Sequence, residues 1–165
     1  KNPEESVRIL KIHTVHNFSK CDADEEYLKF PMEIESAGTR QMFGLMGPLS
    51  DALMNGKVVL VDDFGSYLHP VLSRWILEQF KADVNTKNAQ LIVNTHATHL
   101  MDTRTLQRRD QIFFTEKSRE DGSASLYSLS DFRGVRKETD ILKAYFAGRF
   151  DAIPDISSDW VFNDE

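Results

Sequence analysis

Cysteine is almost absent from this 165-residue sequence. Cys21 stands alone, which excludes an internal disulfide framework and fits a reducing compartment. No apolar run approaches the roughly 18 residues that a membrane span needs, and the first residues lack the basic-then-apolar pattern of a secretory signal. We therefore expect a soluble, cytoplasmic chain with no membrane partner. The sequence opens on lysine instead of methionine, which suggests a fragment, a processed chain or an excised piece.

Positive charge is also in short supply. The chain carries 26 acidic and 20 basic residues, a net charge of −6, so the fold as a whole offers nucleic acid no general attraction. One basic segment, RTLQRRD at residues 104–110, could contact phosphates, although such charge runs are usually solvated surface. The length and a hydrophobic content of 41% predict a single globular domain, residues 1–165, with a sizeable core.

The first part of the chain predicts a hairpin followed by a helix. Residues 7–18 and 27–36 alternate apolar and polar side chains, which predicts two antiparallel strands within residues 1–35. From Gly38 the apolar residues recur at helical spacing until Asn-Gly ends the pattern, which predicts a helix of about four turns. Gly47-Pro48 could kink that helix.

The middle and last parts predict an α/β unit and a second hairpin. Lys57–Phe64 and Ala89–His96 are short apolar runs typical of parallel strands covered on both faces. Pro70 can open the helix between them, and a strand–helix–strand order with right-handed crossover makes a parallel unit within residues 36–102. Residues 103–165 predict a hairpin, an amphipathic helix at 137–150 and an irregular acidic tail. Three aromatic residues of that helix are expected in the core: Tyr145, Phe146 and Phe150.

Polar residues follow both predicted strands of the middle unit. Asp62 and Asp63 end the first strand, and Thr95 and His96 end the second. Ligand sites form beyond the carboxyl ends of parallel strands, so we expect all four side chains to face one crevice. Asp62 could hold Mg²⁺, Asp63 could orient an attacking water, and His96 could contact a γ-phosphate, as in a nucleoside triphosphate hydrolase. An aspartate pair at a strand end is, however, as often a simple turn cap.

Residues Glu35–Asp102, taken together, resemble the C-terminal half of an ABC-type ATPase head. The resemblance is to AAA family ATPases related to abortive-infection and OLD-type phage-defence proteins. It rests on the order and spacing of ESAGT at 35–39, VVLVDD at 58–63 and NTH at 94–96, and it covers roughly residues 33–155. It implies an α/β fold, the C-terminal lobe of an ABC/P-loop-type ATPase, with parallel strands, flanking helices and antiparallel hairpins at both ends.

The resemblance also implies roles for individual residues. Ser36 and Gly38 match the signature segment, which contacts the γ-phosphate of ATP held by the opposite protomer. Without that context the same pattern would be a plain serine helix cap. Asp62 matches the Walker B aspartate that supports Mg²⁺, Asp63 occupies the position of the catalytic glutamate, and His96 matches the switch histidine. His69 has no direct chemical role by this match, and we expect it in the turn that enters the helix.

The sequence departs from the family in three ways. Asp63 is one methylene shorter than glutamate, which predicts slow hydrolysis or a preference for ATP-bound association. Gly65 stands where a second acidic residue is common. No G-x-x-x-x-G-K-[ST] phosphate loop is present, and the Gly56-Lys57 pair precedes a strand.

The resemblance therefore implies one half of a composite site. Binding of ATP and Mg²⁺ would require a missing N-terminal ATPase half, and a homodimer would form through an ATP sandwich. The chain is expected to be inactive by itself and an ATPase only as part of its full-length parent. An effector protein or nucleic acid is a further expected partner.

Two other functions stay open on the residues alone. A metal-dependent hydrolase or nuclease could use mixed carboxylate and histidine ligands to activate water, drawn from Asp62, Asp63, His96, His99 and Asp102. A non-catalytic interaction module would use the aspartates only to end a strand.

Overall fold

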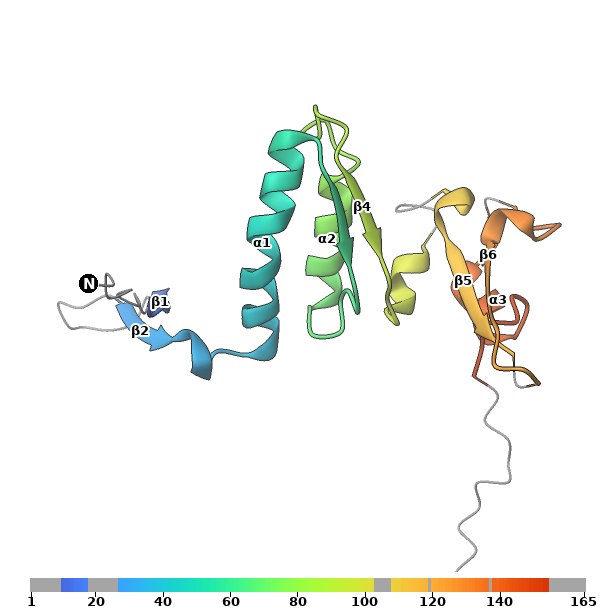
Figure 1. Cartoon of the computed structure of the whole chain (residues 1–165), viewed down its shortest axis with the longest axis horizontal. Helices are drawn as coiled ribbons and strands as arrows, with labels where there is room; N and C mark the ends of the chain where they lie inside the picture. Colours follow the sequence, from blue (N-terminus) through green and yellow to red (C-terminus); the bar gives the residue numbers. More distant parts are fainter. Residues whose placement is uncertain (1–9, 18–26, 103–107, 119, 137, 155–165) are drawn as a thin grey trace, which may run out of the picture.

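The computed structural model describes residues 10–17, 27–102, 108–118, 120–136 and 138–154. Within these residues the strands form three separate two-stranded sheets. The three sheets follow one another along the chain, and the second is the one that helices α1 and α2 accompany (Figure 1). In the described ranges, short 3-10 turns join the elements: η1 (Met32–Ile34), η2 (Thr98–Met101), η3 (Arg109–Gln111) and η4 (Leu129–Asp131).

The first sheet is the predicted antiparallel hairpin. Strand β1 (His13–Asn17) pairs with β2 (Tyr27–Pro31). Its register sets His13 opposite Pro31, and the Met32 N–H closes the end of the ladder on the Ile12 carbonyl at 3.1 Å. The prediction is thus confirmed where the chain is described.

Helix α1 (Ala37–Asn55) is the helix predicted from Gly38 onward, and it is 19 residues long. It begins after Ser36, whose hydroxyl accepts a hydrogen bond from the Thr39 N–H, as an N-cap residue does. It ends at Gly56, whose φ of 67° is the left-handed conformation that suits glycine. Pro48 lies within the helix.

The middle sheet is the predicted parallel unit. Strand β3 (Val58–Val61) and strand β4 (Gln90–Val93) pair in parallel, and helix α2 (Pro70–Gln79) connects them. One face of the sheet packs with both helices into a core whose fully buried side chains include Phe64 and Ile76. The predicted strand–helix–strand order is confirmed.

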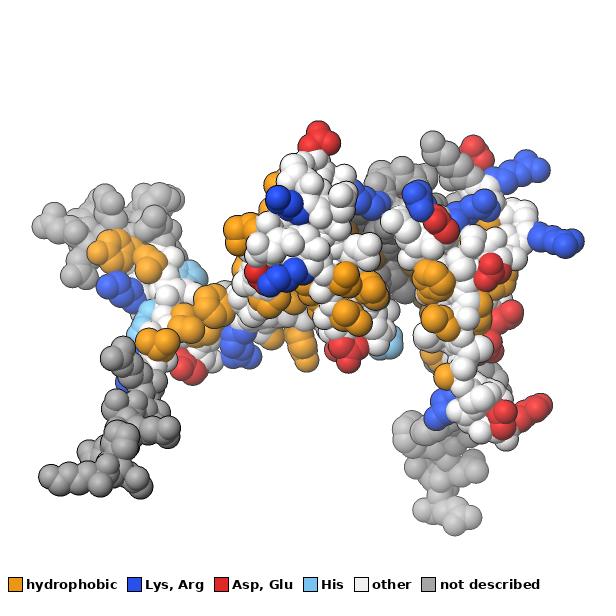
Figure 2. Space-filling model, turned by 45° about the horizontal axis from the view of Figure 1, so that its top comes forward, with side chains coloured by type: hydrophobic (Ala, Val, Ile, Leu, Met, Phe, Trp, Pro, Cys, Tyr) orange, Lys and Arg blue, Asp and Glu red, His pale blue; other side chains and the backbone are white. Residues whose placement is uncertain are grey.

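The other face of this sheet is not covered by the residues that the structure describes. Leu60 is 75% exposed, Ile92 54% and Val58 52%. Figure 2 shows apolar side chains gathered on the surface of this middle part of the chain. The prediction that both faces are covered is therefore wrong for this part of the chain, although parallel sheets are normally covered on both sides.

The last part has its own core. Strand β5 (Phe113–Lys117) pairs antiparallel with β6 (Ala124–Ser128), and helix α3 (Ile141–Phe146) follows. The ring of Phe114 stacks on Tyr145 and on Phe150, at centroid distances of 5.8 Å and 5.2 Å. The hairpin and these two core aromatics agree with the sequence, but Phe146 is 64% exposed, so its predicted burial is wrong.

The predicted terminal helix is also shorter than expected. It begins only after Asp140, whose carboxylate accepts a hydrogen bond from the Lys143 N–H at 2.9 Å. The acidic tail lies outside the described residues, as does Cys21. No helix in the described ranges is long and apolar enough to cross a membrane.

Candidate functional site

All of the predicted site residues lie at one end of the middle unit, which consists of strands β3 and β4 with helices α1 and α2. The carboxyl ends of β3 and β4 and the N-termini of α1 and α2 lie at this same end (Figure 1). Parallel strands place their ligand-binding residues beyond their carboxyl ends, and helix N-termini carry free N–H groups and a positive partial charge. This end therefore combines the two features that favour an anionic ligand.

Asp62 links the ends of the two strands. Its Oδ1 accepts hydrogen bonds from Asn94 Nδ2 at 2.8 Å and from the Asp63 N–H at 3.1 Å. Since Val61 lies opposite Val93 in the parallel register, the next residues, Asp62 and Asn94, leave the sheet side by side. Asn94 is a site residue that sequence reasoning missed, and this register is the signal that could have identified it.

Asp63 adopts an unusual backbone conformation. Its φ is 53°, in the left-handed region, which few residues other than glycine, asparagine and aspartate occupy. Its carboxylate accepts a hydrogen bond from the Ser66 hydroxyl at 2.5 Å, and the side chain is exposed. The turn thus holds this carboxylate at the surface, where the hydrogen bond from Ser66 fixes its position.

The next two residues anchor the turn to the core. The Phe64 side chain is fully buried, and its N–H donates to the Asn94 carbonyl at 2.8 Å. Gly65 has a φ of 87°, and a Cβ added there would lie 3.4 Å from the Ala97 Cβ. That contact distance is ordinary, so the left-handed backbone, which would strain an acidic side chain here, is the reason that glycine suits this position.

Thr95 and His96 differ in what they offer the site. The Thr95 hydroxyl donates to the Phe64 carbonyl and accepts the Ala97 N–H at 3.0 Å. The prediction that Thr95 faces a shared crevice is therefore wrong, because the turn itself uses its hydroxyl. His96 is exposed at the end of β4, and its role stays a prediction.

The segment at the start of α1, whose sequence resembles a signature motif, contacts the turn that follows Asp63. A Cβ added to Gly38 would lie only 2.7 Å from the Tyr67 carbonyl oxygen, so this position requires glycine. Ser36 caps α1 through the Thr39 N–H at 3.1 Å. Both residues thus have a structural role, and a role in phosphate binding stays a prediction. The close approach of Gly38 to the Tyr67 carbonyl also joins the start of α1 to the turn that contains Asp62 and Asp63.

Helix α2 contacts His69, His99 and Asp102. His69 caps that helix, with its Nδ1 accepting the Val71 N–H at 3.2 Å, so its predicted place in the entering turn is confirmed. His99 Nε2 lies 3.0 Å from the Ser73 hydroxyl, and Asp102 Oδ2 lies 2.9 Å from Arg74 Nη2.

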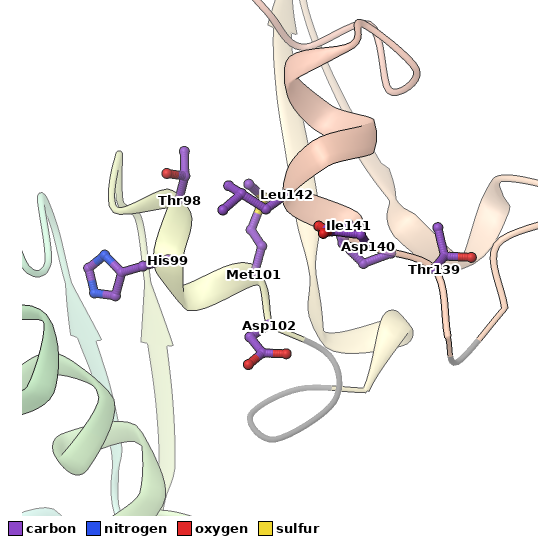
Figure 3. A pocket seen from close by; sticks show the side chains of 8 residues that line it. All are labelled: Thr98, His99, Met101, Asp102, Thr139, Asp140, Ile141 and Leu142. Carbon is purple, nitrogen blue, oxygen red and sulfur yellow. The ribbon is translucent and has the colours of Figure 1, made fainter.

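These contacts weaken the case for a metal-dependent hydrolase. A hollow of about 220 Å³ lies between η2 and the start of α3, and there His99 points away from Asp140 and Thr139 (Figure 3). Within the described ranges no three His, Cys, Asp or Glu side chains are grouped so that they could hold a metal ion. The five candidate ligands therefore do not assemble into one metal site.

His99 gives the fold a pH dependence. Burial, and then the nearby charge of Arg74, lower its pKa from the usual 6.5. A neutral His99 therefore contributes stability that is fully present above pH 6.5 and is lost as the pH falls through the lowered pKa. We expect urea denaturation to show a falling unfolding free energy from pH 7 towards pH 5 and a flatter profile in His99→Gln. An unchanged profile in that variant, with the exposed His13→Gln as control, would contradict this assignment.

Comparison with known proteins gives one family. Residues 22–102 match the family model described as "AAA domain, putative AbiEii toxin, Type IV TA system". No curated protein matches the chain, and no solved structure does. AAA family domains generally bind ATP with Mg²⁺. The match, on a mixed α/β chain with small parallel and antiparallel sheets, supports an AAA-type ATPase family and a nucleotide-binding, ATPase-like function.

Proposed function

We propose that this chain supplies the signature, Walker B and switch-histidine elements of an ABC-type ATPase head, as its C-terminal half. One observation carries the proposal. The start of α1, at Gly38, packs against the Tyr67 carbonyl of the turn that begins with Asp62 and Asp63. A helix N-terminus suited to an anion and a carboxylate pair suited to a cation thus belong to one structural unit.

Asp62 fits a role in binding Mg²⁺. The hydrogen bonds that it accepts from Asn94 and from the Asp63 N–H both end on Oδ1, which leaves Oδ2 for a cation or its water shell. Mg²⁺ usually takes only one or two carboxylates together with phosphate oxygens and waters. A Mg²⁺ site at Asp62 therefore does not need a group of three protein ligands, which the described residues do not form. Bound there with ATP, Mg²⁺ would neutralise phosphate charge.

Asp63 is the residue that would orient the attacking water. The Ser66 hydroxyl holds its carboxylate in place, and the left-handed backbone at Asp63 turns the side chain out to solvent. Because the aspartate is shorter than glutamate, we expect slow turnover. His96, exposed at the end of β4, would contact the terminal phosphate from the neighbouring strand.

The uncovered sheet face supports a partner half. Leu60 and Ile92 expose more than half of their surface, and β3 and β4 pair only with each other among the described residues. We propose that a segment or chain carrying the phosphate loop adds strands to this sheet and covers its apolar face. We extend the proposal to a bacterial defence ATPase, in line with the toxin description of the matched family.

The test of this function is ATP-dependent association of the natural full-length protein. With Mg²⁺ and a non-hydrolysable ATP analogue, light scattering should show the mass of a dimer. Ser36→Glu should abolish this dimer, because it places a negative charge where the γ-phosphate of the opposite protomer would bind. Ser130→Glu, at an exposed position of turn η4, is the matched control and should still dimerise. A wild-type protein that stays monomeric at saturating analogue would refute the proposal.

A further inference from the structure

Glu35 connects the β1–β2 hairpin to the start of α1. Its Oε1 accepts a hydrogen bond from the Thr14 hydroxyl and lies 2.7 Å from His16 Nε2. Both partners belong to β1, and the Glu35 side chain is only 9% exposed. A single carboxylate oxygen thus receives two donors from the hairpin, one residue before the cap of α1.

The hairpin side of this link is well supported. The Thr14 hydroxyl also lies 3.3 Å from the Phe30 carbonyl oxygen, so its single proton is shared between this carbonyl and Glu35. The His16 ring packs edge-on against Phe30 at 5.0 Å. Both donors are therefore fixed to β2 as well as to β1. The hydrogen bonds from Thr14 and His16 lower the pKa of Glu35, so its carboxylate stays charged at neutral pH and makes charge-assisted bonds.

The helix side is held at two further points. Arg40 Nη1, in the first turns of α1, donates to the Glu33 carbonyl at 3.0 Å. Gly38 abuts the Tyr67 carbonyl. The start of α1 is therefore held between the hairpin, through Glu35, and the turn that follows the aspartate pair.

We propose that Glu35 is a positioning residue, which locks the hairpin to the start of α1 and so sets the position of Ser36 and Gly38. Its bearing on nucleotide binding rests on the proposed function above. Glu35 itself touches no nucleotide in this scheme. It acts through the cap of α1, so its loss should weaken ATP-dependent association more than the rate of hydrolysis once the dimer has formed.

The test compares Glu35→Ala with Glu33→Ala in the full-length protein. Glu33 is exposed and lies two residues earlier in the same segment, which makes it a matched control. Hydrogen exchange of the Thr39 and Arg40 amides, which bond to Ser36, should quicken about tenfold in Glu35→Ala, as loss of a charge-assisted bond predicts. The ATP concentration for half-maximal hydrolysis should rise by a similar factor, while kcat stays within about twofold.

Glu35→Gln should recover part of both effects, because its amide oxygen can still accept from Thr14. Unchanged exchange of the strand β5 amides checks that the variants fold. Unchanged exchange at Thr39 and Arg40 in Glu35→Ala would overturn the proposal. So would faster exchange with an unaltered ATP requirement. If exchange quickens but the wild type never associates with ATP, the link itself is supported and the proposed function is what fails.

Discussion

Replacing Asp63 with asparagine is expected to lower kcat for ATP hydrolysis in the full-length protein by about 100- to 10,000-fold, the usual contribution of a general base. Asparagine has almost the same shape and tolerates the left-handed backbone of this position, where φ is 53°. The substitution therefore removes the charge with little change in the turn. ATP binding and ATP-dependent association should survive, because Asp62 and the start of α1 are untouched.

A matched control exists in the same chain. Asp151 also has a left-handed backbone, with φ of 58°, and it lies after α3, away from the candidate site. Asp151→Asn should leave steady-state hydrolysis unchanged. If Asp63→Asn hydrolyses ATP as fast as the wild type, Asp63 is not the carboxylate that orients the water, and the aspartate turn would then have only a structural role.

Replacing Phe64 with alanine should destabilise the fold by about 3–5 kcal/mol, as large-to-small changes in cores do. The Phe64 side chain is completely buried, in one cluster with Leu49, Leu68 and Ile76. Since Asp63 and Gly65 flank it, loss of this anchor should also loosen the turn. Urea denaturation, followed by circular dichroism, measures the change.

The control for Phe64 is Phe113, an exposed phenylalanine on β5. It is 56% exposed, so Phe113→Ala should cost about 1 kcal/mol or less. A decrease of less than about 1 kcal/mol in the unfolding free energy of Phe64→Ala would contradict this expectation. It would mean that the surrounding side chains fill the cavity left by the ring, or that the core around this turn is not closely packed. In that case the anchoring of the aspartate turn to the core would need another explanation.

Much of the middle unit, strands β3 and β4 with helices α1 and α2, could be predicted from the sequence, because its local patterns agree with its tertiary contacts. Helical spacing and the Ser36 and Gly56 caps define α1, and the apolar runs define β3 and β4. The parallel register also places Asn94 beside Asp62, so this contact follows from the pairing once the strands are aligned.

Other features depend on contacts that a sequence pattern does not carry. The left-handed backbone of Asp63 and the inward hydroxyl of Thr95 come from how the turn closes on Phe64 and β4. The need for glycine at position 38 comes from a carbonyl nearly thirty positions away along the chain, that of Tyr67. Phe146 fits the amphipathic pattern, but it is 64% exposed at the last position of α3, whereas Phe150, beyond the end of the helix, is buried in the core.

The parallel pair β3 and β4 has a practical consequence for handling the protein. Among the described residues each strand has one neighbour only, so each has an outer edge whose N–H and C=O groups are open to another strand. Unprotected edges beside exposed Leu60 and Ile92 are the surface on which chains join edge to edge and aggregate. The free strand edge that would pair with the proposed partner half could thus also pair with the same strand of a second copy. Co-expression with that partner half should therefore prevent the sheet from pairing with itself.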